Sequence, residues 1–181
     1  MTSLISRDKS DWKKALLRTL AHSCGKSPFR HAFEEKLEAS VGIHLAVFTE
    51  PYLTYVLEGK KTVESRFGIT RQPPFERVQP GDILVLKRTS GPVCGLCRVA
   101  SVWYYKLDAR TWPEIERFSE ALCMDGSEFW KKRRAASFAT LMQIEDVHSL
   151  KEFNIAKRDP RSWVIVKGTP LSNQHRIKWQ L

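Results

Sequence analysis

The sequence predicts an α+β fold: a small β-barrel of about five to six strands with flanking helices and a helical hairpin at the amino terminus. Short apolar runs separated by Gly and Pro turns fill residues 43–168, as expected for strands. Before residue 42, apolar residues recur at helical spacing instead. The 181 residues suffice for one domain with an appendage. We therefore expect a helical extension at 1–42, the barrel domain at 43–168 and a basic tail at 169–181.

The amino-terminal extension carries two apolar stripes. The first runs along one face of a helix over residues 8–22, and the second follows Pro28. The second stripe consists of Phe29, Phe33, Leu37 and Val41. A hairpin packed on the domain is one interpretation, and an arm that binds a protein partner or clamps RNA is the other. We favour packing, because an apolar stripe needs cover.

The first strand of the barrel leads into a short helix and then into a charged strand. Residues 44–48 read as the strand, and residues 50–58 as an amphipathic helix that Gly59 ends in a left-handed cap. Alternation along residues 62–67 places Thr62, Glu64 and Arg66 on one face. Lys61 stands at the mouth of this strand, so we expect Lys61, Glu64 and Arg66 to converge on one side of the sheet.

The remaining chain alternates strands, turns and two helices. Strands are predicted at 83–86, 93–105, 139–147 and 162–167, and helices at 112–123 and from Ser127 onward. A loop of about a dozen residues follows Gly68, a length typical of lids beside sites. Its Phe75 looks exposed, and it either stacks on a base or packs under the loop. The basic run at 131–134 circles a helix, so we expect a general positive field from it.

Composition points to a polyanionic partner. Thirty Lys and Arg residues against twenty Asp and Glu give a net charge of +10, although a generally basic surface would look the same. The sequence has no apolar run of the roughly 20 residues that a membrane helix needs and no secretion signal, so we expect a cytoplasmic protein. Cys94 and Cys97 would face opposite sides of a regular strand. We therefore expect no metal site and no cofactor.

The pattern Gly-x-Lys-x-x-Glu-x-Arg, formed by Gly59, Lys61, Glu64 and Arg66, carries a family resemblance. A Pro-containing helix precedes it, and Pro80-Gly81-Asp82 follows before an apolar strand. In this order and spacing, residues 44–168 resemble the ASCH domain, a relative of the PUA-like RNA-binding barrels. The resemblance implies binding of RNA or a modified nucleoside in a cleft. The candidate ligand-binding residues are Lys60, Lys61, Thr62, Glu64, Arg66 and Phe75.

Some ASCH relatives are amidohydrolases that remove the acetyl group of acetylcytidine with a lysine, a threonine and a glutamate, and a few resemble nucleases. The resemblance implies Lys61 as the lysine and, by spacing from Thr111, Glu120 as the glutamate. The threonine position holds Glu64, which cannot donate a hydroxyl hydrogen and adds charge beside Lys61. Thr62 is a weak substitute. Whether Glu64 neutralises Lys61 or turns to Arg66 stays open.

Three hypotheses follow. The first is binding of RNA or a nucleoside in the cleft. The second is an acetylcytidine amidohydrolase or RNA-processing hydrolase, with Lys61, Glu64 and Glu120 as catalytic residues. The third is a protein-interaction module that acts through the amino-terminal helices.

Overall fold

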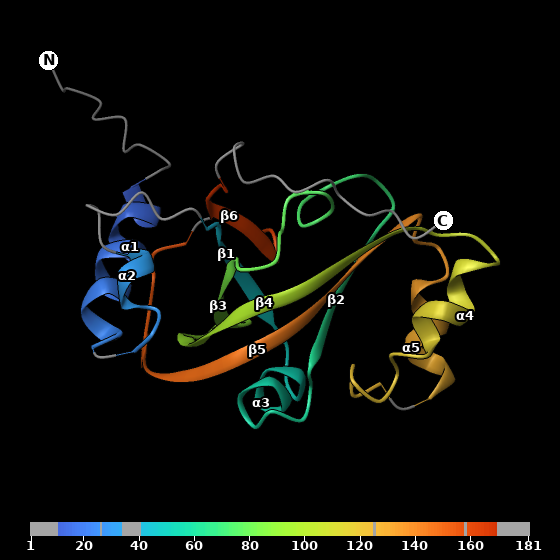
Figure 1. The fold of residues 1–181 in the computed structure, drawn as a ribbon, viewed down its shortest axis with the longest axis horizontal. Coiled ribbons are helices and arrows are strands. Elements are labelled where there is room, and N and C mark those ends of the chain that lie inside the picture. Colours follow the sequence, from blue (N-terminus) through green and yellow to red (C-terminus); the bar gives the residue numbers. More distant parts are fainter. Residues whose placement is uncertain (1–10, 26, 34–40, 125, 158, 170–181) are drawn as a thin grey trace, which may run out of the picture.

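The computed structural model describes residues 11–25, 27–33, 41–124, 126–157 and 159–169 (Figure 1). The helices are α1 (Asp11–Ser23), α2 (Arg30–Phe33), α3 (Tyr52–Leu57), α4 (Thr111–Glu116) and α5 (Ser127–Arg133). The strands are β1 (Ile43–Phe48), β2 (Val63–Gly68), β3 (Ile83–Arg88), β4 (Val93–Lys106), β5 (Phe138–Phe153) and β6 (Trp163–Lys167). None of these helices has the length and apolar character that crossing a bilayer would require.

The six strands form one mixed sheet in the order β2-β5-β4-β3-β1-β6. Strands β1 and β3 are parallel, and every other neighbouring pair is antiparallel. The sheet curls into a half-barrel, with α1 and α2 at one end and α4 and α5 at the other (Figure 1). The predicted α+β fold, a small barrel of five to six strands with flanking helices, is confirmed.

Two element boundaries differ from the prediction. Strand β5 continues to Phe153 instead of ending near residue 147, because β4 pairs with it along its whole length across three register shifts. The helix expected over 112–123 ends at Glu116 and continues as tight turns, in which Phe118 and Ser119 donate backbone hydrogen bonds three residues back.

The amino-terminal helices pack on the sheet. Leu16 and Leu20 of α1, together with Phe29 and Phe33, share one buried cluster with residues of β1, β3, β4 and β6. Lys13 adds a polar tie, since its Nζ donates to the carbonyl of Ile165 at 2.7 Å. The apolar stripes are therefore covered by the domain itself, as the packing interpretation expects. Leu37 and most of the basic tail at 169–181 lie outside the described residues.

Asp82, in the Pro-Gly-Asp turn, links the start of β1 to neighbouring segments through hydrogen bonds. Its carboxylate accepts the backbone N–H groups of Gly42 at 2.6 Å and Gln79 at 2.9 Å. His44 Nε2 and the Thr169 hydroxyl contact it at 2.9 Å each. Four partners match the roughly four lone pairs of a carboxylate. This buried group thus joins β1, the turn before β3 and the segment after β6.

The long loop after β2 packs against β4 and β5 and does not form a free lid. Phe75 is only 5% exposed and packs edge-on against Tyr104 and Phe138, with ring centroids 5.4 and 5.0 Å apart. The backbone N–H of Val78 also donates to the Tyr104 hydroxyl at 3.2 Å. The expectation of an exposed Phe75 is wrong, because the aromatic ring gains more from burial between two rings than from solvent.

Candidate functional site

A tight turn between α3 and β2 points Lys61 inward. Gly59 adopts φ +72°, the left-handed conformation expected at a helix end. The N–H groups of Lys60 and Lys61 then both donate to the carbonyl of Tyr55, at 2.9 and 3.0 Å. As a result the Lys61 side chain is only 2% exposed, although it follows a surface turn.

The Lys61 ammonium has acceptors for all three of its hydrogens. Its Nζ donates to the carbonyls of Val63 at 2.7 Å and Leu122 at 3.2 Å, and it lies 3.4 Å from Glu64 Oε2. Burial lowers the pKa of Lys61, while the Glu64 carboxylate opposes this shift. The three acceptors favour the protonated amine, so Lys61 acts here as an anchor for the carboxylate.

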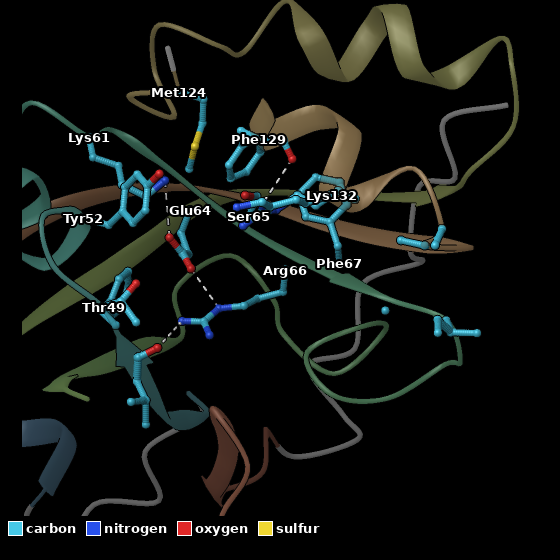
Figure 2. Close-up of a pocket in the computed structure, with 17 residues that line it drawn as sticks. Thr49, Tyr52, Lys61, Glu64, Ser65, Arg66, Phe67, Met124, Phe129 and Lys132 are labelled. Carbon is cyan, nitrogen blue, oxygen red and sulfur yellow. Dashed lines mark hydrogen bonds and ion pairs between the residues drawn. The ribbon is translucent and has the colours of Figure 1, made fainter. Parts of the chain in front are cut away.

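Glu64 lies between Lys61 and Arg66, as Figure 2 shows. Arg66 Nε is 2.8 Å from Glu64 Oε1, and its terminal nitrogen donates to the carbonyl of Val47 at 3.0 Å. The guanidinium carbon also lies 5.1 and 5.3 Å from the ring centroids of Phe48 and Trp163. The two alternatives left open by the sequence are therefore both realised: one carboxylate oxygen faces Lys61 and the other faces Arg66.

The Lys61–Glu64–Arg66 chain lines a cavity of ≈ 540 Å³ between β2 and α5. Its remaining walls are formed by the end of β1, the first residue of α3, the inward side of α5 and the segments next to them (Figure 2). The lining residues that the sequence did not indicate include Tyr52, Met124, Phe129, Lys132 and Arg133. This volume lies within the range of pockets that hold small organic ligands.

The basic run at 131–134 divides between the cavity and the outer surface. Lys132 and Arg133 line the cavity, whereas Lys131 pairs with Glu128 at 3.0 Å and Arg134 lies against Glu116 at 2.6 Å. The expected spread around the helix is present, and two of the four cations line the cavity. The cavity lining holds four cationic side chains and one carboxylate, Glu64, a formal charge of +3.

Arg133 is fixed by aromatic neighbours of the cavity. Its guanidinium carbon lies 3.3 Å from the ring centroid of Phe129 and 5.7 Å from that of Phe67, and it donates to the carbonyl of Phe129 at 3.1 Å. Partial burial lowers the pKa of Arg133. A held guanidinium loses less conformational entropy on binding an anion than a free one would.

Three of the residues singled out in the sequence lie away from the cavity lining. Lys60 is 65% exposed and pairs with Glu58 at 2.7 Å. Thr62 and Glu120 are also exposed, and neither belongs to the lining residues. Glu120 is exposed, whereas Trp112, Ile115 and Leu122 of the same segment are buried. The placement gives no support to a ligand-binding role for Lys60 or Thr62, or a catalytic role for Glu120.

A second hollow of ≈ 880 Å³ lies next to the cavity. The two share Arg66, Phe67, Gly68 and Ile69 of β2 and its exit. Phe75, the remaining predicted binding residue, lines this second hollow together with Trp163. The predicted residues therefore fall beside two neighbouring hollows, with Arg66 in the wall of both.

The described part of the chain contains no group of three His, Cys, Asp or Glu side chains placed to hold a metal ion. Cys94 and Cys97 are free and buried, and burial raises the pKa of both thiols. Protonated, enclosed thiols are poor nucleophiles and poor metal ligands. The cavity lining itself offers charged groups, hydroxyl groups and aromatic surfaces.

Comparison with known proteins identifies the fold. The family model of the ASCH domain matches residues 47–166. A crystal structure of ASCH from Zymomonas mobilis superimposes with a TM-score of 0.54 at 14% identity, covering 68% of this chain and 86% of that one. A mutant of that protein gives 0.53 at 16% identity, covering 68% and 87%. No curated protein matches this chain significantly. The chain belongs to the ASCH domain family.

Proposed function

We propose that this protein binds RNA or a nucleoside-like ligand in the cavity formed around Lys61, Glu64 and Arg66. The observation that carries the proposal is the Glu64 carboxylate, fixed between two cations in the wall of a hollow with a formal charge of +3. Membership in the ASCH family, whose domains are generally thought to bind RNA, supports the same function.

Glu64 supplies base recognition in this proposal. Each of its oxygens contacts one cation, so about half of the lone pairs of the carboxylate remain for a ligand. An acceptor in a cationic wall suits the exocyclic amine of cytosine or adenine, and uracil lacks that donor. Lys61 and Arg66 hold the carboxylate in one place, so it needs no reorganisation when the base arrives.

The other walls suit the remaining parts of a nucleotide. Lys132 and Arg133 offer positive charge to a phosphate, and Arg66 offers a planar guanidinium. Tyr52 and Phe129 provide aromatic surfaces on which a base can stack. A cavity with one acceptor, several cations and aromatic walls thus has a counterpart for the base and for the backbone of a nucleic acid.

The proposal is tested by measuring the affinity for short single-stranded RNA at several salt concentrations. Arg66→Ala and Lys61→Ala should each weaken binding by about tenfold or more, and Arg66→Ala should also flatten the salt dependence, because Arg66 offers its guanidinium to a phosphate. Lys60→Ala is the matched control, because Lys60 neighbours Lys61 but is 65% exposed and paired with Glu58. Binding that is unchanged in both Arg66→Ala and Lys61→Ala rejects the cavity as the site.

Hydrolysis of acetylcytidine is the second candidate function. One observation favours it: Lys61 is buried in the cavity wall and its pKa is lowered, as a lysine base or nucleophile requires. The three acceptors around Nζ oppose it, since an amine must lose a proton before it attacks. Release of acetate that Lys61→Ala abolishes would establish this activity, and its absence at high enzyme concentration would exclude it.

A further inference from the structure

We propose that the second hollow is a subsite for the adjoining nucleotide of the same strand, so that the ligand is single-stranded RNA of at least two nucleotides instead of a free nucleoside. This inference rests on the proposed function of the first cavity. It assigns a role to the second hollow, which neither Lys61 nor Glu64 lines.

The first argument is continuity. The two hollows share Arg66, Phe67, Gly68 and Ile69, so they follow one another along β2 and its exit. Arg66 lies at the junction, where its side chain is 16% exposed. A ligand occupying both hollows must pass this guanidinium. The group linking two nucleotides is a phosphate, and a guanidinium is the side chain best shaped to meet one.

The second argument is an unused donor. Trp163 lines the second hollow and is only 3% exposed, and its indole Nε1 has no hydrogen-bond partner within the described ranges. A buried N–H without an acceptor destabilises a fold, and such groups are uncommon. An indole N–H can only donate. The Nε1 atom itself is buried, so a ligand acceptor in the hollow, such as a base carbonyl or a phosphate oxygen, satisfies it once the indole ring turns toward the hollow.

The third argument is the character of the walls. Pro73, Pro74, Phe75 and Phe138 give the second hollow flat apolar surfaces, and the lining contains no carboxylate. Phe75, only 5% exposed, packs edge-on against Phe138 at 5.0 Å, and this contact holds the Phe138 ring in place before a ligand arrives. Base stacking on aromatic side chains tolerates every base. The first cavity thus selects a base through Glu64, and the second accepts a neighbour of any sequence.

The experiment compares a cytidine mononucleotide with a cytidine dinucleotide by calorimetry on the full chain. In the wild type the dinucleotide should bind at least about tenfold more tightly, because a second base is stacked. Trp163→Phe keeps a ring beside Arg66 but removes the N–H, and it should lower the ratio of the two affinities several-fold. Trp103→Phe is the control, since Trp103 is a partly buried tryptophan that lines neither hollow.

Each outcome decides the proposal. A tighter dinucleotide whose advantage falls in Trp163→Phe and persists in Trp103→Phe supports the subsite. Equal affinities in the wild type overturn the subsite and leave the proposed function standing. A dinucleotide advantage that Trp163→Phe does not change overturns the assignment to this hollow. If neither ligand binds, the proposed function fails and the subsite fails with it.

Discussion

Two buried carboxylates in this molecule have opposite surroundings. Asp82 meets four donors, from Gly42, His44, Gln79 and Thr169, and it is absent from the lining of both hollows. Glu64 meets two cations and lines a cavity of ≈ 540 Å³. Asp82 is 1% exposed and Glu64 is 5% exposed, so burial alone does not separate them.

The difference lies in how much acceptor capacity the protein itself fills. Four partners use up the lone pairs of Asp82, whereas two contacts leave about half of those of Glu64 available. A filled carboxylate holds the fold together, and a half-filled one beside a hollow can serve a ligand. Substitutions at the two positions should therefore separate stability from binding.

Asp82→Ala should have the largest effect, a loss of about 3–5 kcal/mol in the free energy of unfolding. The change leaves several buried donors without an acceptor, and His44 is 0% exposed. Urea denaturation measures this loss in the free energy of unfolding. Glu58→Ala removes an exposed ion pair with Lys60 and should leave the free energy of unfolding nearly unchanged. Equal losses in the two variants would contradict a structural role for Asp82.

Glu64→Gln should instead change specificity. It keeps the shape of the side chain but weakens the charged acceptor, so the preference for cytidine over uridine ligands should fall by about tenfold or more. Competition binding with the two nucleotides measures the preference. Glu128→Gln is a matched control, because Glu128 is exposed and pairs with Lys131 outside the cavity. A preference that survives Glu64→Gln would assign base recognition to other residues.

Lys132→Ala and Lys131→Ala remove the same type of side chain from neighbouring positions, but only Lys132 lines the cavity. Lys132 lines the cavity, and Lys131 pairs with Glu128. Losing one phosphate contact should reduce the slope of log affinity against log salt by about 0.7 for single-stranded RNA. The reduction is expected for Lys132→Ala and should be smaller for Lys131→Ala. Identical salt slopes for the two variants would show that the basic run acts only as a general positive field.

The smallest expected effect is on pH dependence. Burial lowers the pKa of Lys61 from its ordinary value of 10.5. Between the folded and unfolded pKa values the unfolded chain binds more protons, so the free energy of unfolding contributed by Lys61 rises with pH in that window. Lys61→Met removes this rise, which cannot exceed about 1.4 kcal/mol per pH unit. Urea denaturation of both proteins across the alkaline range measures the difference. A wild-type free energy of unfolding that falls relative to that of Lys61→Met as the pH rises would contradict a lowered pKa.

Much of the fold and the centre of the site could be predicted because their signals are local. Alternation along β2 places Glu64 and Arg66 on one face, and the glycine turn brings Lys61 beside them. The sequence could not show that α5 places Lys132 and Arg133 on the same cavity. That placement depends on packing between α5 and β2, through Phe67 and Phe129 with ring centroids 6.3 Å apart.

The residues predicted by spacing alone fared differently. Spacing from Thr111 predicts Glu120 as a site residue, but its side chain is exposed, whereas Trp112, Ile115 and Leu122 of the same segment are buried. Phe75 was expected at the surface, yet Tyr104 and Phe138 enclose it from distant strands. Counting along the chain fails wherever a turn or a distant contact resets the direction of a side chain.

A crystal structure of the protein with a cytidine mononucleotide tests the central claim most directly. We expect the base in the cavity, with its exocyclic amine within hydrogen-bonding distance of the Glu64 carboxylate and the phosphate of the nucleotide beside Arg66, Lys132 or Arg133. A nucleotide bound elsewhere on the basic surface, with the cavity beside Glu64 empty, would contradict it.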